Sequence, residues 1–337
     1  MPNGVRCRSG SIRGNPAMIS TMFTMPSVRS NRGLLVFGEF FIDLVFYNLP
    51  HIPRMGEEVK TASFARFPGG GVATTALVAA KLGTPTNIIT RVGRDALGSP
   101  EWQKMAQGGV STQGSEIDKR FPTAITVCAA FEDDRAMITY DAINAKLERL
   151  LTSGAVQKQV SKARHLHLAC ATRSPQKWTA AIKKVRKRGL TISMDAGWNP
   201  ELFGLPGMAS LLRQCEFTFP NAAEAKAMTG EKTVEAAARE LARSVRIPVI
   251  KLGPDGSLTI RDGKIVRVKS IRVRAVDATG AGDAFNGGFL HGYLAGWPLE
   301  ECMRAGNVCG ALATTGAGGS AAIPTQQKLK KLMEKLR

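Results

Sequence analysis

The sequence predicts an α/β protein with a doubly wound, mostly parallel sheet flanked by helices, and with a small β-sheet lid. From residue 34 onward, short apolar runs alternate with helical stretches. This alternation implies parallel strands joined by right-handed crossovers, which place helices on both faces of the sheet. Two strand-like segments, 58–67 and 123–140, contain no intervening helix and predict the lid. An edge extension of the main sheet is the alternative interpretation.

The individual strands and helices are predicted from the strand period of two residues and the helix period of 3.6 residues along the chain. The helix at 175–188, for example, starts at a Ser-Pro pair, and proline is favoured at a first helical position. The lid segment 123–140 is expected to form a hairpin that turns at 132–135. The expected strands are 34–37, 42–46, 87–90, 164–169, 191–195, 217–219, 248–252, 258–260 and 271–276. The expected helices are 72–82, 99–107, 175–188, 222–228, 234–245, 284–294, 299–314 and 325–336.

The first 32 residues are predicted to be a disordered basic segment that precedes one domain over 33–337. Residues 1–32 are rich in Ser, Arg, Gly, Pro and Met, contain no acid and show no strand or helix period. A segment without acids is typical of organelle transit peptides, but Met18, Met22 and Met25 leave a later natural start equally open. A cytoplasmic location is the main expectation, with organelle import as the alternative.

Composition and charge limit the classes of function. The formal net charge is +19, but the acid-free segments 1–38 and 149–194 carry +16 of it and the rest is nearly neutral. The basic run 183–188 is predicted to be the solvated end of a helix. A nucleic-acid patch is the alternative, which the near absence of interleaved aromatic residues disfavours. No apolar run approaches the ~18 residues of a membrane span.

The cysteines and histidines suggest no metal site. The six cysteines are scattered without a C-x-x-C pair, which predicts reduced thiols in a cytosol. His165 and His167 alternate on a predicted strand and are interpreted as a structural pair.

The run from Val276 to Gly288 combines an anion site with a candidate base. Glycines between a strand and a helix allow a ligand to approach the backbone, and the N–H groups of a helix start favour a phosphate. Asp283 would repel that phosphate unless it takes a proton from a nucleophile that attacks it. Phosphoryl transfer to a hydroxyl needs these two parts. An ordinary helix start with an Asp in its first turn is the alternative.

This run resembles a known signature. The pattern D-x-T-G-A-G-D-x-F, here 277–285, is similar to the C-terminal signature of the ribokinase-like carbohydrate kinases, a family that includes fructokinases, ketodeoxygluconate kinases and adenosine kinases. Further matches follow the family's order and extend the resemblance over about 34–325. They are G-E-F-F-I-D at 38–43, P-G-G-G at 68–71 with its helix at 76–83, R-V-G-R-D-A-L-G at 91–98, and N-A-A-E at 221–224.

The resemblance implies roles for the acceptor side of the site. Asp283 would be the base, and the backbone N–H groups of Gly280, Ala281 and Gly282 would stabilise the transferred charge. Asp43 would accept hydrogen bonds from sugar hydroxyls. The remaining substrate-binding residues are Gly69, Gly70, Gly71 and Thr74. Thr74 stands where the family usually has Asn, and Phe41 stands where ribokinases have a polar sugar contact, so ribose is disfavoured.

The resemblance also implies which residues bind the nucleotide and its cations. The expected nucleotide-binding residues are Asn199, Asn221, Glu224, Lys251, Gly253, Gly256, Asn307 and Gly310. Glu224 would hold Mg²⁺ through water, since Mg²⁺ keeps several waters. A capping box is the competing explanation for Asn221 and Glu224, and both can hold. K⁺ is a further implication, held by Asp277 and a loop at 316–320.

The expected function is an ATP-dependent, Mg²⁺-dependent kinase for a primary hydroxyl of a small sugar or sugar acid. A fructokinase-like or ketodeoxygluconate-like substrate is preferred over ribose. One alternative is a nucleoside kinase of the same fold. Another is an inactive family member that acts as a nucleic-acid or assembly partner. A homodimer through the lid is an additional expectation, and neither a Walker A motif nor a protein-kinase motif set is present.

Overall fold

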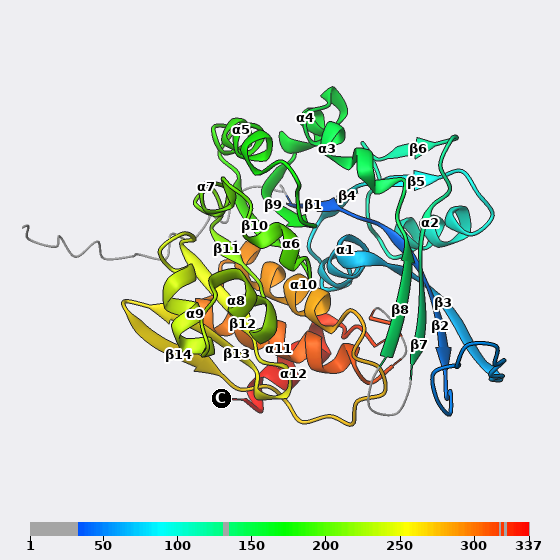
Figure 1. Ribbon diagram of the computed structural model, residues 1–337. Coiled ribbons are helices and arrows are strands. Elements are labelled where there is room, and N and C mark those ends of the chain that lie inside the picture. The colour runs from blue at the N-terminus through cyan, green and yellow to red at the C-terminus, as the bar shows by residue number, and fades with distance from the viewer. Residues whose placement is uncertain (1–32, 131–134, 317, 320–321, 337) are drawn as a thin grey trace, which may run out of the picture.

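Eight strands form the central sheet of the computed structural model, which describes residues 33–130, 135–316, 318–319 and 322–336 (Figure 1). The strand order is β14-β13-β12-β11-β10-β9-β1-β4. The strands from β4 to β12 pair in parallel, and β12, β13 and β14 pair antiparallel. Their bounds are β1 Gly33–Gly38, β4 Thr86–Ile89, β9 Ala163–Ala169, β10 Thr191–Asp195, β11 Phe217–Thr218, β12 Ile247–Lys251, β13 Ser257–Arg261 and β14 Lys264–Val268. The predicted disorder of 1–32 and the hairpin turn at 132–134 lie outside the described residues.

Helices cover both faces of the sheet, as the alternation predicts. Alternate residues of β1 enter two different cores: Leu35 and Phe37 pack with one cluster, and Leu34 and Val36 with the other. The first cluster lies under α3, α4, α5, α7 and α9, and the second under α1, α10 and α11. The helices are α1 Gly70–Lys81, α2 Gly98–Gln107, α3 Leu147–Leu151, α4 Gly154–Val160, α5 Pro175–Arg186, α6 Pro200–Phe203, α7 Met208–Leu212, α8 Ala222–Thr229, α9 Val234–Leu241, α10 Ala281–Leu294, α11 Leu299–Ala313 and α12 Gln326–Glu334.

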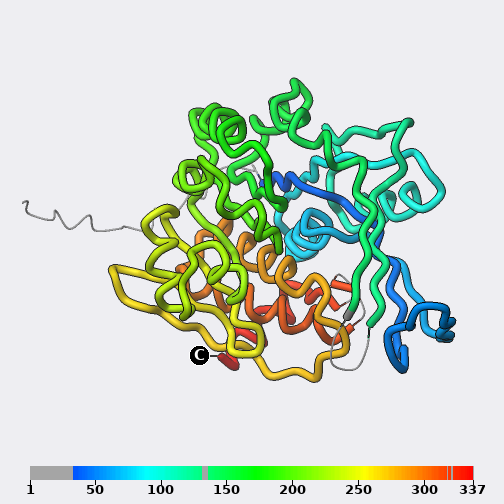
Figure 2. The backbone as a smooth tube through the Cα atoms, in the orientation of Figure 1, coloured from blue at the N-terminus to red at the C-terminus, as the bar shows by residue number. Residues whose placement is uncertain are grey.

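The lid is a separate four-stranded sheet in the order β3-β2-β7-β8. Its strands are β2 Phe41–Tyr47, β3 Ser63–Gly69, β7 Ala124–Ala130 and β8 Arg135–Tyr140. In Figure 2 the blue β2–β3 pair and the green β7–β8 pair extend together on one side of the molecule. The separate lid sheet confirms the prediction that the two segments leave the main sheet.

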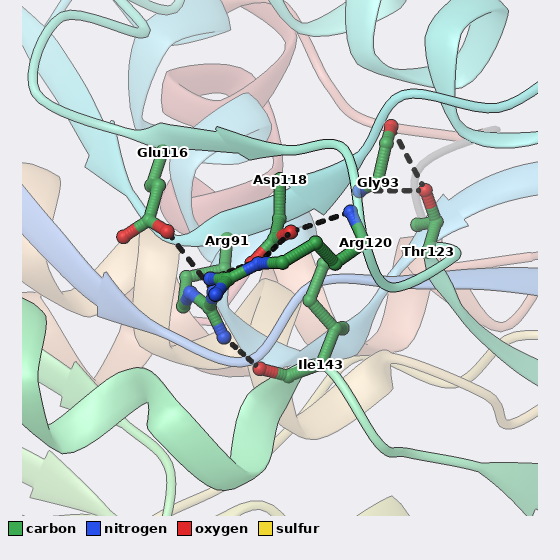
Figure 3. Close-up of polar contacts among 7 residues, drawn as sticks. All are labelled: Arg91, Gly93, Glu116, Asp118, Arg120, Thr123 and Ile143. Atoms are coloured by element: carbon green, nitrogen blue, oxygen red, sulfur yellow. Dashed lines mark hydrogen bonds and ion pairs between the residues drawn. The ribbon is translucent and has the colours of Figure 1, made fainter.

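A buried polar cluster holds the small β5–β6 sheet (β5 Arg91–Gly93, β6 Glu116–Asp118) against the loop after the lid (Figure 3). The buried Arg91 guanidinium donates to the carbonyl of Ile143 at 2.5 Å and to Glu116 at 3.0 Å, and it also pairs with Asp118. Three acceptors therefore offset the cost of burying this charge.

The turn after β5 fixes the start of the lid strand β7. Asp95 accepts hydrogen bonds from the backbone and the hydroxyl of Thr123 at 2.8 and 2.6 Å, and from the N–H of Gly98 at 2.7 Å. A Cβ at Gly98 would lie 1.9 Å from the Thr123 hydroxyl, so only glycine fits. The R-V-G-R-D-A-L-G motif is thus explained by packing and hydrogen bonding.

The structure corrects two predicted strands. The expected strand 271–276 is irregular, and the N–H groups of Val276 and Asp277 donate to the Thr314 carbonyl instead of to a ladder. Its apolar residues Ile271, Val273 and Ala275 line a cavity together with Ser270 and Arg272, so the segment forms a cavity wall and not a strand. The segment 42–46, which is expected outside the two lid segments, is β2, and β2 pairs with β3 and β7 and belongs to the lid. Short elements such as β5, β6 and β14 were missed.

Candidate active site

The N-terminus of α10 lies in the bend that the glycine run predicts. Gly280 is the N-cap with φ +70°, where non-glycine residues are strained, and a Cβ there would lie 2.8 Å from the Cα of Gly319. No side chain caps the helix, and the N–H groups of Gly282 and Asp283 have no backbone acceptor among the described residues. Unpaired N–H groups and the helix dipole make this end suitable for an anion.

Two cavities meet at this helix end. A cavity of ≈ 520 Å³ lies between the lid and the body and includes Thr279, Gly280 and Asp283 in its wall. A second cavity, of ≈ 430 Å³, lies on the other side and includes Ala281 and Gly282. We refer to them as the lid cavity and the body cavity. A group held at the start of α10 can therefore face both cavities.

Strand register places Asp43 on the inner face of the lid. Phe67, Asp43, Thr126 and Thr139 are cross-strand neighbours in β3, β2, β7 and β8. Asp43, Thr126 and Thr139 line the lid cavity. The lid therefore contributes a row of hydrogen-bonding groups that face Asp283 across the cavity.

The glycines at the start of α1 allow this approach. A Cβ at Gly69 would lie 2.2 Å from the Asp43 carboxylate, and a Cβ at Gly71 would lie 2.9 Å from an oxygen of Asp283. Gly70 has φ +79° and lies against the carbonyl of Glu39. A side chain at Gly69 or Gly71 would therefore displace one of the two acidic residues.

Three carboxyl groups of the lid cavity are hard to ionise. Burial, with the charge of Asp195 as the next cause, raises the pKa of Asp283 to about 7. Burial and the charge of Asp277 raise the pKa of Asp43 to about 7, and burial and Asp141 do the same for Glu39. A carboxyl with a pKa near neutrality is suited to take up a proton at physiological pH.

Lys251, at the end of β12, reaches the same helix end from the body side. Its ammonium lies 2.7 Å from the carboxylate of Asp195, which also accepts a hydrogen bond from Asn286 at 2.7 Å. Burial would lower the pKa of Lys251, but the carboxylates of Asp195, Glu224 and Asp283 raise it overall. A Cβ at Gly282 would lie 3.0 Å from this ammonium. A permanent cation therefore lies beside the N-terminus of α10.

The capping box predicted for α8 is confirmed. Asn221 accepts from the N–H of Glu224 at 2.9 Å, and Glu224 accepts from the N–H of Asn221 at 2.7 Å. Glu224 is buried, and burial together with Asp195 raises its pKa. The cap accounts for one carboxylate oxygen, which leaves the other for a ligand.

The other expected nucleotide residues divide between the two cavities. Gly253, Gly256, Asn307 and Gly310 line the body cavity with Lys251. The Asn307 amide donates to the carbonyls of Val268 and Lys269, so it also holds the chain after β14. Asn199 lies elsewhere: it lines the lid cavity and donates to the Ala196 carbonyl at 2.7 Å.

Asp277 connects two loops. Its carboxylate accepts from the N–H of Thr279 at 2.8 Å and from the N–H of Gly318 at 2.9 Å. Both oxygens are thus engaged by backbone groups, and Asp277 holds Gly318 close to the start of the helix. Residues 317 and 320 of this loop lie outside the described residues.

Comparison with known proteins agrees with this geometry. A family model described as "pfkB family carbohydrate kinase" matches residues 31–326. The chain belongs to this family. As a pfkB kinase it is a phosphotransferase of the sugar and nucleoside kinase group. None of the helices in the described part of this kinase is long and apolar enough to cross a membrane.

Relatives of this pfkB kinase differ in substrate. The ribokinase of Haemophilus influenzae is 26% identical over 309 residues, which cover 89% of this chain and 98% of the relative. The 2-dehydro-3-deoxygluconokinase of Bacillus subtilis is 28% identical over 288 residues, which cover 80% and 87%. The nucleoside kinase of Methanothermobacter thermautotrophicus is 25% identical over 297 residues, which cover 87% and 93%.

Solved structures share the fold of this pfkB kinase. Arabidopsis thaliana ribokinase, complexed with ribose and ATP, matches with a TM-score of 0.77 and 24% identity over 90% of this chain and 99% of that chain. An E. coli protein described as a ribokinase II, solved with ATP and Mg²⁺, matches with a TM-score of 0.78 and 21% identity over 90% and 99%.

Sequence reasoning missed two acidic residues of the pfkB kinase site. Glu39 lines the lid cavity just after β1, and Asp195 binds Lys251 at the end of β10. Both follow or end parallel strands, the same signal that singles out binding residues at the carboxyl edge of such sheets. That signal was available in the sequence.

Proposed function

We propose that this pfkB kinase transfers the γ-phosphoryl group of ATP to a primary hydroxyl of a small sugar. The observation that carries the proposal is the meeting of two cavities at the unpaired N-terminus of α10, with Asp283 on the lid side and Lys251 on the body side. In this arrangement the sugar occupies the lid cavity and ATP the body cavity.

The reaction follows from these positions. The oxygen of the sugar hydroxyl attacks the γ-phosphorus while Asp283 takes the proton of that hydroxyl. The bond between the γ-phosphorus and the oxygen that bridges it to ADP breaks, and ADP leaves. The N–H groups of Gly280 and Gly282 and the ammonium of Lys251 stabilise the charge on the transferred group, while the N–H of Ala281 donates to the Ala278 carbonyl at 3.3 Å. The lid excludes water, which prevents hydrolysis of ATP.

The residues present fit Mg²⁺. Among the described residues no group of three or more His, Cys, Asp or Glu forms a ready-made metal site. Mg²⁺ usually takes only one or two carboxylates and fills its shell with phosphate oxygens and water. Glu224, through water, is the residue that would hold it, and Mg²⁺ would neutralise phosphate charge. The E. coli structure with ATP and Mg²⁺ supports the use of Mg²⁺ together with ATP.

K⁺ activation is a further part of the proposal. Asp277 and the 316–320 loop lie beside the helix start, and the two are hydrogen-bonded to each other. Backbone carbonyl groups of the described residues beside Asp277 would hold a cation there. Higher turnover in K⁺ than in Na⁺ at equal ionic strength supports the site, and equal turnover rejects it.

Nucleoside phosphorylation is the second candidate. Trp198 is 61% exposed and lines the lid cavity, where an indole could stack on a base. A nucleoside kinase is also among the relatives.

An ADP-release screen over fructose, tagatose, ribose, ketodeoxygluconate and adenosine separates these functions. We expect release that depends on an added sugar, with ribose not the best substrate. Release with adenosine alone would favour the nucleoside kinase. No ADP release with any sugar or nucleoside would favour the inactive member.

A further inference from the structure

The lid cavity has an unusual charge balance. Its described lining residues include the carboxylates of Glu39, Asp43, Asp141 and Asp283, and none of them is Lys, Arg or His. The body cavity, in contrast, contains Lys251 and Arg272. Positive charge therefore lies on the side where a nucleotide phosphate would bind, and negative charge lies where the acceptor would bind.

Three carboxyl groups of the lid cavity have no direct partner, although the charge of Lys251 partly compensates that of Asp283. Within the described parts of the chain, the side chains of Glu39, Asp43 and Asp283 make no hydrogen bond and no ion pair, although each is partly buried. Lys251 is already paired with Asp195. Arg173 lowers the pKa of Glu39, but it is an exposed residue outside the cavity wall. These carboxylates therefore need hydrogen-bond donors from the ligand.

Above about pH 7, where the carboxyl groups of Glu39, Asp43 and Asp283 ionise, an anionic ligand would meet their negative charge. Two like charges several ångströms apart near a protein surface repel enough to change affinity roughly tenfold or more, and several carboxylates act together here. A hydroxyl group, in contrast, donates to a carboxylate without adding charge. The cavity thus discriminates against acids and in favour of donors.

The remaining walls suit a neutral sugar ring. Trp198 is 61% exposed and Met137 is 50% exposed, and both line the lid cavity with Phe41. The C–H face of a sugar packs well on such an apolar surface, while its hydroxyls point to the carboxylates.

We infer that the substrate of this kinase is an uncharged polyol, and that sugar acids and sugar phosphates are excluded by the lid-cavity carboxylates. The inference rests on the proposed function and narrows it. It removes the ketodeoxygluconate-like substrate from the two classes that the sequence favoured. It also separates this chain from its Bacillus subtilis relative, which is named for a sugar acid.

The test compares neutral sugars with their acids in the full-length protein. Fructose, ribose and glucitol are paired with ketodeoxygluconate, ribonate and gluconate, and both ADP release and direct calorimetric binding are measured. We expect kcat/KM to be at least about tenfold higher for the best neutral compound than for any acid. The binding affinities measured by calorimetry should rank the compounds in the same order. An acid that binds or reacts as well as the best neutral compound overturns the inference.

Charge variants identify the cause. Glu39→Gln removes one negative charge at nearly constant shape, and we expect the neutral-to-acid ratio to fall by about tenfold. Glu231→Gln, in the exposed turn between α8 and α9, removes the same charge elsewhere and should leave the ratio unchanged. A ratio that Glu39→Gln does not change, in a variant with wild-type circular dichroism, overturns the electrostatic explanation. Neutral-sugar binding without any turnover would support the charge inference and contradict the proposed reaction.

Discussion

At the scale of single residues, Asp283 combines three properties of a base. It lies at an unpaired helix N-terminus, it faces the lid cavity, and burial raises its pKa to about 7. The raised pKa means that the carboxyl is protonated below about pH 7 and can accept a proton only above it. Activity that depends on Asp283 must therefore increase with pH in this range.

We predict that kcat/KM rises as the pH increases through about 7 and then levels off, because kcat/KM reports the ionisation of the free enzyme. The measurement is a pH profile of initial rates from pH 5.5 to 8.5 at constant ionic strength. Asp43 and Glu39 also have a pKa of about 7, so the pH profile of the Glu39→Gln variant serves as a control. In this variant kcat/KM should still rise with pH. A flat profile over this range contradicts the assignment.

The raised pKa of Asp43 predicts that its ionisation lowers the free energy of unfolding of the protein. Asp43 binds its proton more tightly in the folded state than in the unfolded state, so its favourable contribution is complete below about pH 4 and is lost as the pH rises through about 7. Asp43→Asn should therefore increase the free energy of unfolding at pH 8 by roughly 1–2 kcal/mol, and by less at pH 5. Urea denaturation of the unliganded protein measures this difference, with Glu231→Gln as the exposed control. A loss of stability at pH 8 would show that Asp43 holds the fold together.

Residue chemistry was only partly predictable. Asp283 and Asp43 stand in recognisable motifs, and the structure brings both to one cavity. Glu39 and Asp195 gave a weaker signal, because a single acidic residue after a strand is also a common turn residue. Their significance depends on Lys251 and on the lid, which are distant in sequence.

At the scale of elements, the lid determines access to the cavity. The row of Asp43, Thr126 and Thr139 lies on three neighbouring strands, so movement of the lid moves the sugar contacts together. The sequence predicts two lid segments and the strand β2, but it does not predict that β2 belongs to the lid. The reason is that β2 is as apolar as β1 and follows it directly. Strand pairing depends on partners that periodicity does not specify.

We predict that the β7–β8 segment, 124–140, exchanges its amide hydrogens more slowly when sugar and a non-hydrolysable ATP analogue are bound. Ligand hydroxyls that bridge the lid and the body should restrict opening of the lid. Hydrogen exchange with mass spectrometry measures the effect, and peptides from α5 provide an internal reference. Unchanged exchange over 124–140 at saturating ligand would reject a closing lid.

At the scale of the whole molecule, the outer face of the lid carries exposed apolar side chains. Ile138 is 77% exposed and Phe64 is 55% exposed, and the same rows contain the partly buried Phe46 and Val127, whereas Leu44 packs against the core. Exposed apolar groups of this kind favour association. The expected homodimer through the lid would cover them.

We predict that Ile138→Asp shifts the protein from dimer to monomer, because a buried charge would destabilise the interface. Size-exclusion chromatography with light scattering measures the mass. Ile117→Asp is the matched control, since Ile117 is 48% exposed on β6 and lies outside the lid sheet. A wild-type protein that is monomeric at micromolar concentration would contradict the dimer.

The fold class was predictable because alternation of strands and helices permits few arrangements. Boundaries between the two sheets were less predictable, as β2 and the false strand at 271–276 show. The latter alternates in sequence but is irregular, and Ile271, Val273 and Ala275 line the body cavity together with Arg272. Cavities form from several segments, so periodicity within one segment cannot reveal them.

The central claim is that Asp283 acts as the base of a sugar kinase. The most direct measurement is sugar-dependent ADP release by the wild-type protein and by Asp283→Asn, which keeps the shape of the side chain and removes the proton acceptor. We predict a fall in kcat of roughly 10²–10⁴-fold, with ATP affinity and the melting temperature retained. Near-normal turnover by a folded Asp283→Asn protein would contradict the claim.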